Sequence, residues 1–274
     1  MRNTRAARLF AGIARLTVRE KLPARAAGLS YFLTMTFFPM LICLYTMLGS
    51  LFPAMGELRD FLSIMMPAES VSAVMDFLRY VSENLSNTML VAALVVLVTS
   101  ASAAYRVIHN ATMDMRGGPR ENGLLVLLFS LVFSVLFLIA IYLSVLLIVT
   151  GRWFLDFVDR HFRYWNISGS WSWARFVLLW LLLFVLEGAI CRFTTPRNPT
   201  ARILPGAAAA SALQVGVSIL FSWFIGVTSR YPLVYGSLAS VIIMMLWLYL
   251  WGLLLLLGNA LNISLEQIGD SRQA

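Results

Sequence analysis

Residues 237–262 read SLASVIIMMLWLYLWGLLLLLGNALN and contain no Asp, Glu, Lys or Arg. About 20 apolar residues in an α-helix, rising about 1.5 Å each, span a hydrocarbon core of about 30 Å. Further charge-free runs lie between Arg25 and Glu57, Glu83 and Arg106, Glu121 and Arg152, and Arg202 and Arg230. The pattern predicts a chain that crosses a membrane several times.

A sixth apolar run, 173–193, is interrupted by Arg175, Glu187 and Arg192. With 60% hydrophobic and 12% charged residues, the chain has about half the charged fraction of a soluble domain. The runs are continuously apolar rather than alternating, which favours helices over barrel strands. We therefore predict an all-α, polytopic bundle of six transmembrane helices at about 29–52, 88–105, 123–150, 173–193, 203–227 and 237–262.

The charge distribution predicts the orientation of this bundle. In the first 28 residues only Glu20 opposes Arg2, Arg5, Arg8, Arg15, Arg19, Lys21 and Arg25, whereas acids dominate residues 53–87. Because cytoplasmic loops collect Lys and Arg, both termini are expected in the cytoplasm, with 263–274 as a short cytoplasmic tail. The same rule explains the net charge of +8 without a nucleic-acid partner.

Two polar segments outside the spans have amphipathic patterns. In residues 1–28, Leu9, Ile13 and Leu16 recur at helical spacing, with arginines on the other side. Such a helix would lie in the inner interface, where it either only sets the topology or binds anionic lipid headgroups. In the first outside loop, 57–66 and 70–85 are predicted to form two further amphipathic helices.

Ionisable groups inside spans are costly to bury and are candidates for function. Glu187 is the clearest: it either pairs with Arg192 or another cytoplasmic-side arginine, or faces a substrate or a proton. Arg106, at the inner end of the second span, either extends toward phosphate headgroups or forms an anion site. Asn259 and Asn262 either join helices by hydrogen bonds or contribute to the same binding site.

Other residues in the spans have a predicted role in helix shape and packing. Pro39 should kink the first span, because proline removes one helical hydrogen bond. Ala208, Ala212 and Gly216 recur every four residues and would let another helix approach closely.

The sequence contains no enzyme signature. It has no HExxH, GxSxG, P-loop or CxxC motif, and its two histidines, His109 and His161, are predicted on opposite sides of the membrane. Cys43 and Cys191 lie in predicted spans and fit neither a disulfide framework nor a zinc motif. We expect no catalytic activity, no cofactor and no metal.

Several motifs along the chain resemble one known family. They are Ala26-Ala-Gly-Leu-Ser-Tyr31 with Pro39, the Cys191–Pro196 junction with Pro205-Gly206, Tyr235-Gly236-Ser237, Trp247 with Tyr249, and Gly258-Asn-Ala-Leu-Asn262. They resemble the YihY/virulence factor BrkB family of bacterial inner-membrane proteins. One position differs: the family commonly has Glu where this chain has Ala260.

The resemblance implies six spans with both termini inside and an envelope protein suspected of transport. The family also carries a ribonuclease label, which the short cytoplasmic turns of this chain do not support. The leading hypothesis is a transporter or translocator of an amphipathic or anionic envelope substrate. The alternative is a scaffold or interaction protein of the envelope, and self-association stays open in either case.

Overall fold

The computed structural model describes residues 2–48, 59, 63, 68–117, 123–132, 134, 135, 139, 167–195, 202–227 and 239–270, and within them the regular structure is entirely helical. The helices are α1 (Arg2–Arg19), α2 (Leu22–Leu48), α4 (Ala68–Asn84), α5 (Asn87–Arg116), α7 (Ile167–Thr194), α8 (Leu204–Val227) and α10 (Ala239–Asp270). A shorter apolar helix covers Gly123–Val132. The predicted all-α class is confirmed.

Four helical segments are long and apolar enough to cross a membrane: Leu22–Cys43, Asn87–Arg116, Leu204–Phe221 and Val241–Gly269. They correspond to the first, second, fifth and sixth predicted spans. The predicted third span, 123–150, lies largely outside the described residues, as does the predicted loop helix 57–66.

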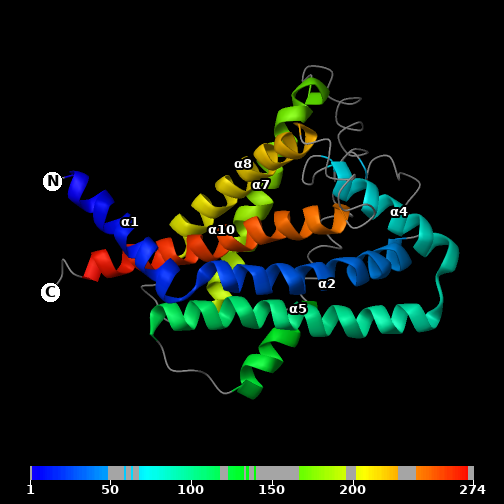
Figure 1. Ribbon diagram of the computed structural model, residues 1–274, viewed down its shortest axis with the longest axis horizontal. Helices are drawn as coiled ribbons and strands as arrows, with labels where there is room; N and C mark the ends of the chain where they lie inside the picture. Colours follow the sequence, from blue (N-terminus) through cyan, green and yellow to red (C-terminus); the bar gives the residue numbers. More distant parts are fainter. Residues whose placement is uncertain are drawn as a thin grey trace.

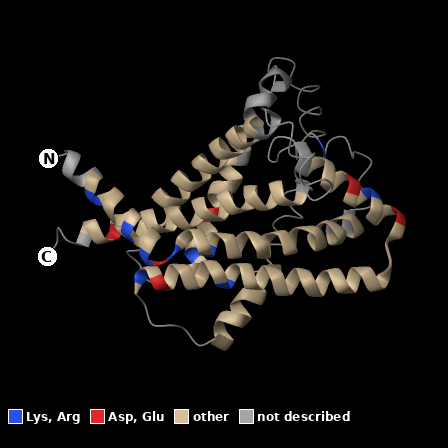
Figure 2. Cartoon of the chain, in the orientation of Figure 1, with Lys and Arg blue, Asp and Glu red and all other residues tan. Residues whose placement is uncertain are grey.

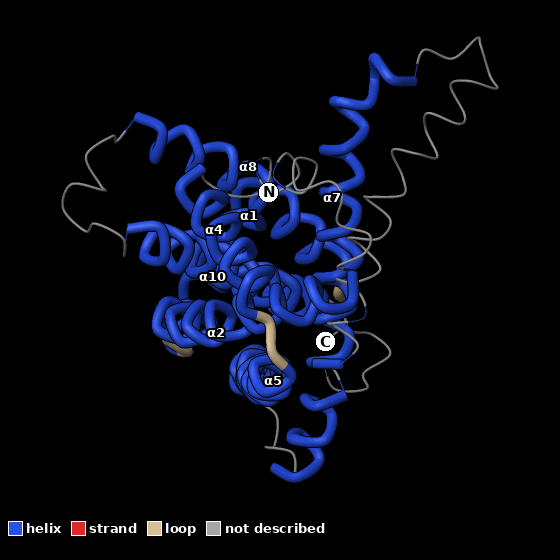
Figure 3. The backbone as a smooth tube through the Cα atoms, turned by 90° about the vertical axis from the view of Figure 1, so that its right-hand side faces the viewer, coloured by secondary structure: helices blue, strands red, loops and turns tan. Residues whose placement is uncertain are grey.

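The helices form one elongated bundle (Figure 1). Viewed along its length, α2 lies between α5 and α10 (Figure 3), and each of these neighbours packs against it. On the other side of α10 lies α8, which in turn packs against α7. The helix α1 and the last turns of α10 lie at the same end of the bundle, which we call the terminal end, and α4 lies at the opposite end.

Two residues, Glu20 and Lys21, separate α1 from α2, and the second of them has an unusual backbone conformation. Lys21 has a φ of 51°, a left-handed conformation that is uncommon for residues other than glycine. The Arg25 Nε atom donates to the Glu20 carbonyl oxygen at 2.8 Å and supports the bend. The predicted N-terminal segment 1–28 is therefore divided between α1 and the first turns of α2.

The helix α5 has a defined cap at each end. The Ser86 Oγ atom accepts from the Met89 N–H, and Gly117 ends the helix with a φ of 66°. At 30 residues α5 is about 45 Å long, more than a hydrocarbon core of about 30 Å. The helix consequently continues past the predicted span end at 105.

Pro39 lies inside α2, which is helical on both sides of it.

Apolar and charged side chains are distributed as in a membrane bundle. The charged residues of the described helices gather mainly toward the two ends (Figure 2). Buried clusters line α10, with Leu41, Val74 and Trp247 toward α4 and with Leu22 and Leu256 toward the terminal end. Large apolar side chains remain exposed on the outer faces of α5, α7 and α8, where lipid would cover them: Val91, Val95, Val177, Val185, Leu220 and Trp223.

Candidate functional site

The side chain of Asn262 joins α10 to the start of α8. Its Oδ1 atom accepts from the Gly206 N–H at 2.6 Å, and its Nδ2 atom donates to the Ile203 carbonyl oxygen at 3.0 Å. The first N–H groups of a helix lack partners within that helix. Asn262 therefore acts as an N-cap supplied by another helix.

Two glycines allow this contact, because a side chain at either would collide with the opposite helix. A Cβ atom on Gly206 would lie 2.1 Å from the Gly258 carbonyl oxygen and 2.5 Å from the Asn262 Cγ atom. A Cβ atom on Gly258 would lie 2.8 Å from the Gly206 carbonyl oxygen. The backbones of α8 and α10 thus touch at this crossing, and this accounts for the Pro205-Gly206 and Gly258–Asn262 motifs in structural terms.

Asn259 makes a separate contact, toward α5. Its Nδ2 atom donates to the Thr112 Oγ1 atom at 2.9 Å, and both residues are buried. Within the described part of the chain, the Asn259 Oδ1 atom has no hydrogen-bond partner. Ala260, at the position where the resemblance implies Glu, is fully buried in an apolar cluster.

Glu187 lies where α7, α8 and α10 meet. The Gln214 Nε2 atom donates a hydrogen bond to Glu187 Oε1 and a second one, at 3.3 Å, to the Trp251 carbonyl oxygen. Glu187 and Gln214 each have a relative exposure of 2%. Arg192 is exposed, so the described partner of the carboxylate is an amide rather than that arginine.

One helical turn beyond Gln214, two tryptophans converge on a single hydroxyl. The Nε1 atoms of Trp247 and Trp251 both donate to Ser218 Oγ, at 3.2 and 3.0 Å. Neither Gln214 nor Ser218 was predicted as a site residue from the sequence. Their spacing of four residues in a largely apolar helix was the available signal, because residues four apart share one face.

The small-residue stripe of α8 lies beside this buried face rather than on it. Ala212 and Gly216 are exposed and Ala208 is partly buried. A Cβ atom on Gly216 would meet nothing within 4 Å. Among the described helices, α8 packs instead through its adjacent face, which carries Ala207, Ala210, Ser211, Gln214 and Ser218.

Arg106 lies at the contact between α5 and the helix Gly123–Val132. Its Nη1 atom donates to Ser102 Oγ at 2.6 Å and reaches Ser130 Oγ at 3.5 Å. The two serine hydroxyls are themselves 2.6 Å apart and buried. No acidic residue of the described chain pairs with Arg106, which is only partly buried.

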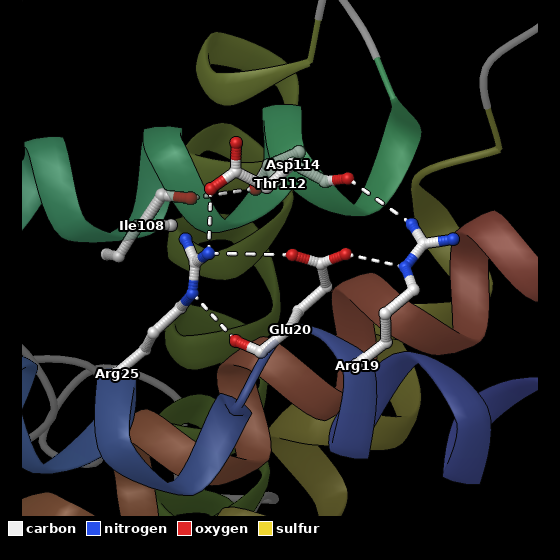
Figure 4. Close-up of polar contacts among 6 residues, drawn as sticks. All are labelled: Arg19, Glu20, Arg25, Ile108, Thr112 and Asp114. Atoms are coloured by element: carbon white, nitrogen blue, oxygen red, sulfur yellow. Dashed lines mark hydrogen bonds and ion pairs between the residues drawn. The ribbon is translucent and has the colours of Figure 1, made fainter.

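Ion pairs tie the helices together at the terminal end (Figure 4). The Arg25 Nη2 atom lies 2.7 Å from Asp114 Oδ2 and 3.5 Å from Glu20 Oε2, and Arg19 Nε lies 2.7 Å from Glu20 Oε1. These contacts connect the α1–α2 bend to α5.

A second ion pair joins α5 to α10 at the same end. Arg116 and Glu266 pair through the Nη1 and Nη2 atoms of the guanidinium, at 2.7 and 3.3 Å. The Arg202 backbone N–H also donates to Glu266, at 2.7 Å. Glu266 therefore links three segments of the chain.

The predicted site residues are thus divided among separate helix contacts. Glu187 joins α7 to α8, Asn259 joins α10 to α5, Asn262 joins α10 to α8, and Arg106 joins α5 to the helix Gly123–Val132. Of the motif residues, Tyr31 is half-exposed, Trp247 is buried and Tyr249 is partly buried. Tyr235, Gly236 and Ser237 lie outside the described residues. No group of three His, Cys, Asp or Glu able to hold a metal occurs in the part searched, the described chain.

Comparison with known proteins finds sequence similarity that covers most of the chain. The family model described as virulence factor BrkB matches residues 14–274. The ribonuclease-like protein YfkH of Bacillus subtilis (strain 168) is 26% identical over 252 residues, covering 89% of this chain and 90% of that protein. A UPF0761 membrane protein of Aromatoleum aromaticum is 33% identical over 104 residues, covering 36% of this chain and 26% of that protein. No solved structure matches the chain significantly.

Proposed function

Because the chain belongs to the virulence factor BrkB family, whose model matches residues 14–274, we propose that it is a translocator of an anionic, amphipathic envelope substrate. In this proposal the chain crosses the bacterial inner membrane six times. The segment that starts with Gly123–Val132 is the third span, and α7 is the fourth span. Both termini lie in the cytoplasm, so the terminal end of the bundle is its inner end.

The observation that carries the proposal is that the side chain of Arg106 is held in place by serine hydroxyls and has no acidic partner among the described residues. Arg106 lies about 30 Å along α5 from the start of the helix, which is about the thickness of the hydrocarbon core. An unpaired arginine in a span costs about 2.5–3.5 kcal/mol at the centre and less toward the interface, where Arg106 lies. Ser102 and Ser130 orient the guanidinium but bring no negative charge.

A phosphate or carboxylate headgroup would supply the missing charge. Both described hydrogen bonds of Arg106 use Nη1, so its Nε and Nη2 donors have no partner among the described residues. A planar guanidinium can bind such an anion through two parallel hydrogen bonds. The partial exposure of Arg106 beside an apolar helix suits a ligand with an anionic head and an apolar tail.

The test is movement of a fluorescent phosphatidylglycerol analogue between the leaflets of proteoliposomes that contain the full chain. Loss of a charge-assisted hydrogen bond of about 1.5–3 kcal/mol should slow movement in Arg106→Gln by roughly 10–100-fold. Arg79→Gln, at an exposed position of α4, is the matched control and should match the wild type. An analogue with a neutral head should move slowly in every variant. Equal rates for wild type, Arg106→Gln and protein-free vesicles would refute the proposal.

A second candidate is a scaffold that acts by binding other envelope proteins or copies of itself. The observation that favours it is that Asn259 and Asn262 are both used in helix packing. The exposed stripe of Ala208, Ala212 and Gly216 would then contact a neighbouring chain. Defined partners that co-purify with wild type and Arg106→Gln alike, without lipid movement, would favour this candidate.

Anionic lipid headgroups are the proposed partners of α1. Leu16 is buried against the bundle, while Phe10 and Val18 are 71% and 79% exposed. The exposed Arg8 and Arg15 lie beside this apolar strip. An interfacial helix places such apolar residues among the acyl chains and such arginines among the headgroups.

A further inference from the structure

Glu187 and Gln214 form the most deeply buried acid–amide pair in the described chain. They come from α7 and α8, and the backbone of α10 contributes the Trp251 carbonyl oxygen. Both side chains are 98% buried, since each has a relative exposure of 2%. In the lipid-embedded middle of a bundle no bulk water is at hand to complete their hydrogen bonds.

Counting donors and acceptors shows what the pair lacks. The Gln214 amide has two hydrogens, and both are used: one on Glu187 Oε1 and one on the Trp251 carbonyl. Among the described residues, Glu187 Oε2 and Gln214 Oε1 have no hydrogen-bond partner. Both atoms accept hydrogen bonds, so two unfilled acceptors remain at the junction.

A single proton resolves this deficit. A protonated carboxyl has one O–H donor in addition to its accepting oxygen. With the proton on Oε2, that O–H can donate to the Gln214 carbonyl oxygen while Oε1 keeps accepting from the Gln214 amide. Acid and amide then form a closed, mutually hydrogen-bonded pair, and the buried negative charge disappears.

We propose that Glu187 and Gln214 constitute a proton-binding site inside the bundle, with Glu187 carrying an exchangeable proton and Gln214 recognising the protonated form. The proposal does not depend on Arg106 or on the substrate. A metal cation fits this site less well than a proton. Hard cations take six or more oxygen ligands, whereas this junction offers two side-chain oxygens without a described hydrogen-bond partner.

Other titratable groups near the pair are few. On α7 they are Cys191, one turn on, and the exposed Arg192; α8 has no ionisable residue. On α10 the nearest are Tyr249, partly buried in the core, and Glu266, which pairs with Arg116 of α5 at the terminal end. None of these groups has a described hydrogen bond to the Glu187 carboxyl, whose polar neighbours are the Gln214 amide and the backbone of Ser211.

The test is infrared spectroscopy of the purified full chain, following the C=O stretching band of a protonated carboxylic acid. The wild type should show this band at neutral pH, lose it on alkalinisation and shift it after exchange into deuterium oxide. Glu187→Gln should abolish the band, because an amide of the same shape cannot take up the proton. Gln214→Leu should keep the acid but move the band to the higher frequency of a carbonyl without its hydrogen-bond partner.

Two controls make the result decisive. Glu83→Gln, at an exposed position of α4, should leave the band unchanged, and the thermal unfolding of each variant shows that it is folded. A wild type without the band at neutral pH, or a band that persists in folded Glu187→Gln, would overturn the proposal. Loss of the wild-type band on replacing choline with sodium would also overturn it, since the site would then bind sodium.

Discussion

Replacing Gly206 with alanine should separate α8 from α10 and destabilise the protein. The added Cβ atom would lie 2.1 Å from the Gly258 carbonyl oxygen, whereas ordinary contacts begin at 3.4 Å. The two backbones must therefore move apart by about 1 Å at their closest crossing. This movement also pulls Gly206 away from Asn262, whose hydrogen bond to the Gly206 N–H is 2.6 Å long.

The expected magnitude follows from these two effects. Overpacking in a close-packed interior costs about 1–3 kcal/mol, and each interhelical hydrogen bond contributes about 0.6–1.7 kcal/mol. Alanine recovers up to about 1 kcal/mol through its higher helix propensity. We therefore expect a net loss of about 2 kcal/mol in the free energy of unfolding, or roughly thirtyfold in the folding equilibrium.

The assay is reversible unfolding in mixed detergent micelles with increasing dodecyl sulfate, followed by helical circular dichroism. The matched control is Gly216→Ala in the same helix, where a Cβ atom meets nothing within 4 Å. That variant should be as stable as the wild type or slightly more stable. Wild-type stability of Gly206→Ala, or an equal loss in Gly216→Ala, would refute the close-approach argument.

The same unfolding assay tests three polar contacts. Asn262→Ala removes the cap on α8 and should cost about 1–2 kcal/mol; an unchanged midpoint would show that the cap contributes nothing. Glu266→Gln leaves Arg116, only 12% exposed, without its counter-charge and should cost about 2 kcal/mol. Asp114→Asn should cost at most about 1 kcal/mol, and less in high salt, because Asp114 and its partner Arg25 are each 26% exposed. A larger loss for Asp114→Asn than for Glu266→Gln would contradict this ranking by burial.

The apolar runs were sufficient to predict the four described helices of membrane-spanning length but not where they end. The predicted span 88–105 lies within a helix that continues to Arg116, because the apolar pattern reports contact with lipid and not the hydrogen bonding of the backbone. The end at Gly117 follows instead from a glycine in the left-handed conformation. The break at Lys21 had no such signal, because a lysine seldom takes a positive φ.

Packing faces were predicted less well than helices. The regular spacing of Ala208, Ala212 and Gly216 suggested a packing stripe, yet the described contacts of α8 use Ala207, Ser211 and Gln214. These two faces differ by a rotation of about 100°, which is one residue on an α-helix. Small residues permit close approach on either face, so their spacing alone does not select one.

The sequence by itself determined that the chain is helical and apolar enough to cross a membrane, because length, hydropathy and the absence of charge act locally along each run. It also marked Glu187, Arg106, Asn259 and Asn262 as polar groups in an apolar setting. Only the tertiary structure decided their partners. A hydrogen bond between helices depends on which helix lies opposite and on how the two are shifted along their axes. Helical periodicity specifies which residues share a face, but not which helix packs against that face. Gln214 opposite Glu187 is the clearest case, since the two are 27 residues apart in sequence and meet only where α7 packs on α8.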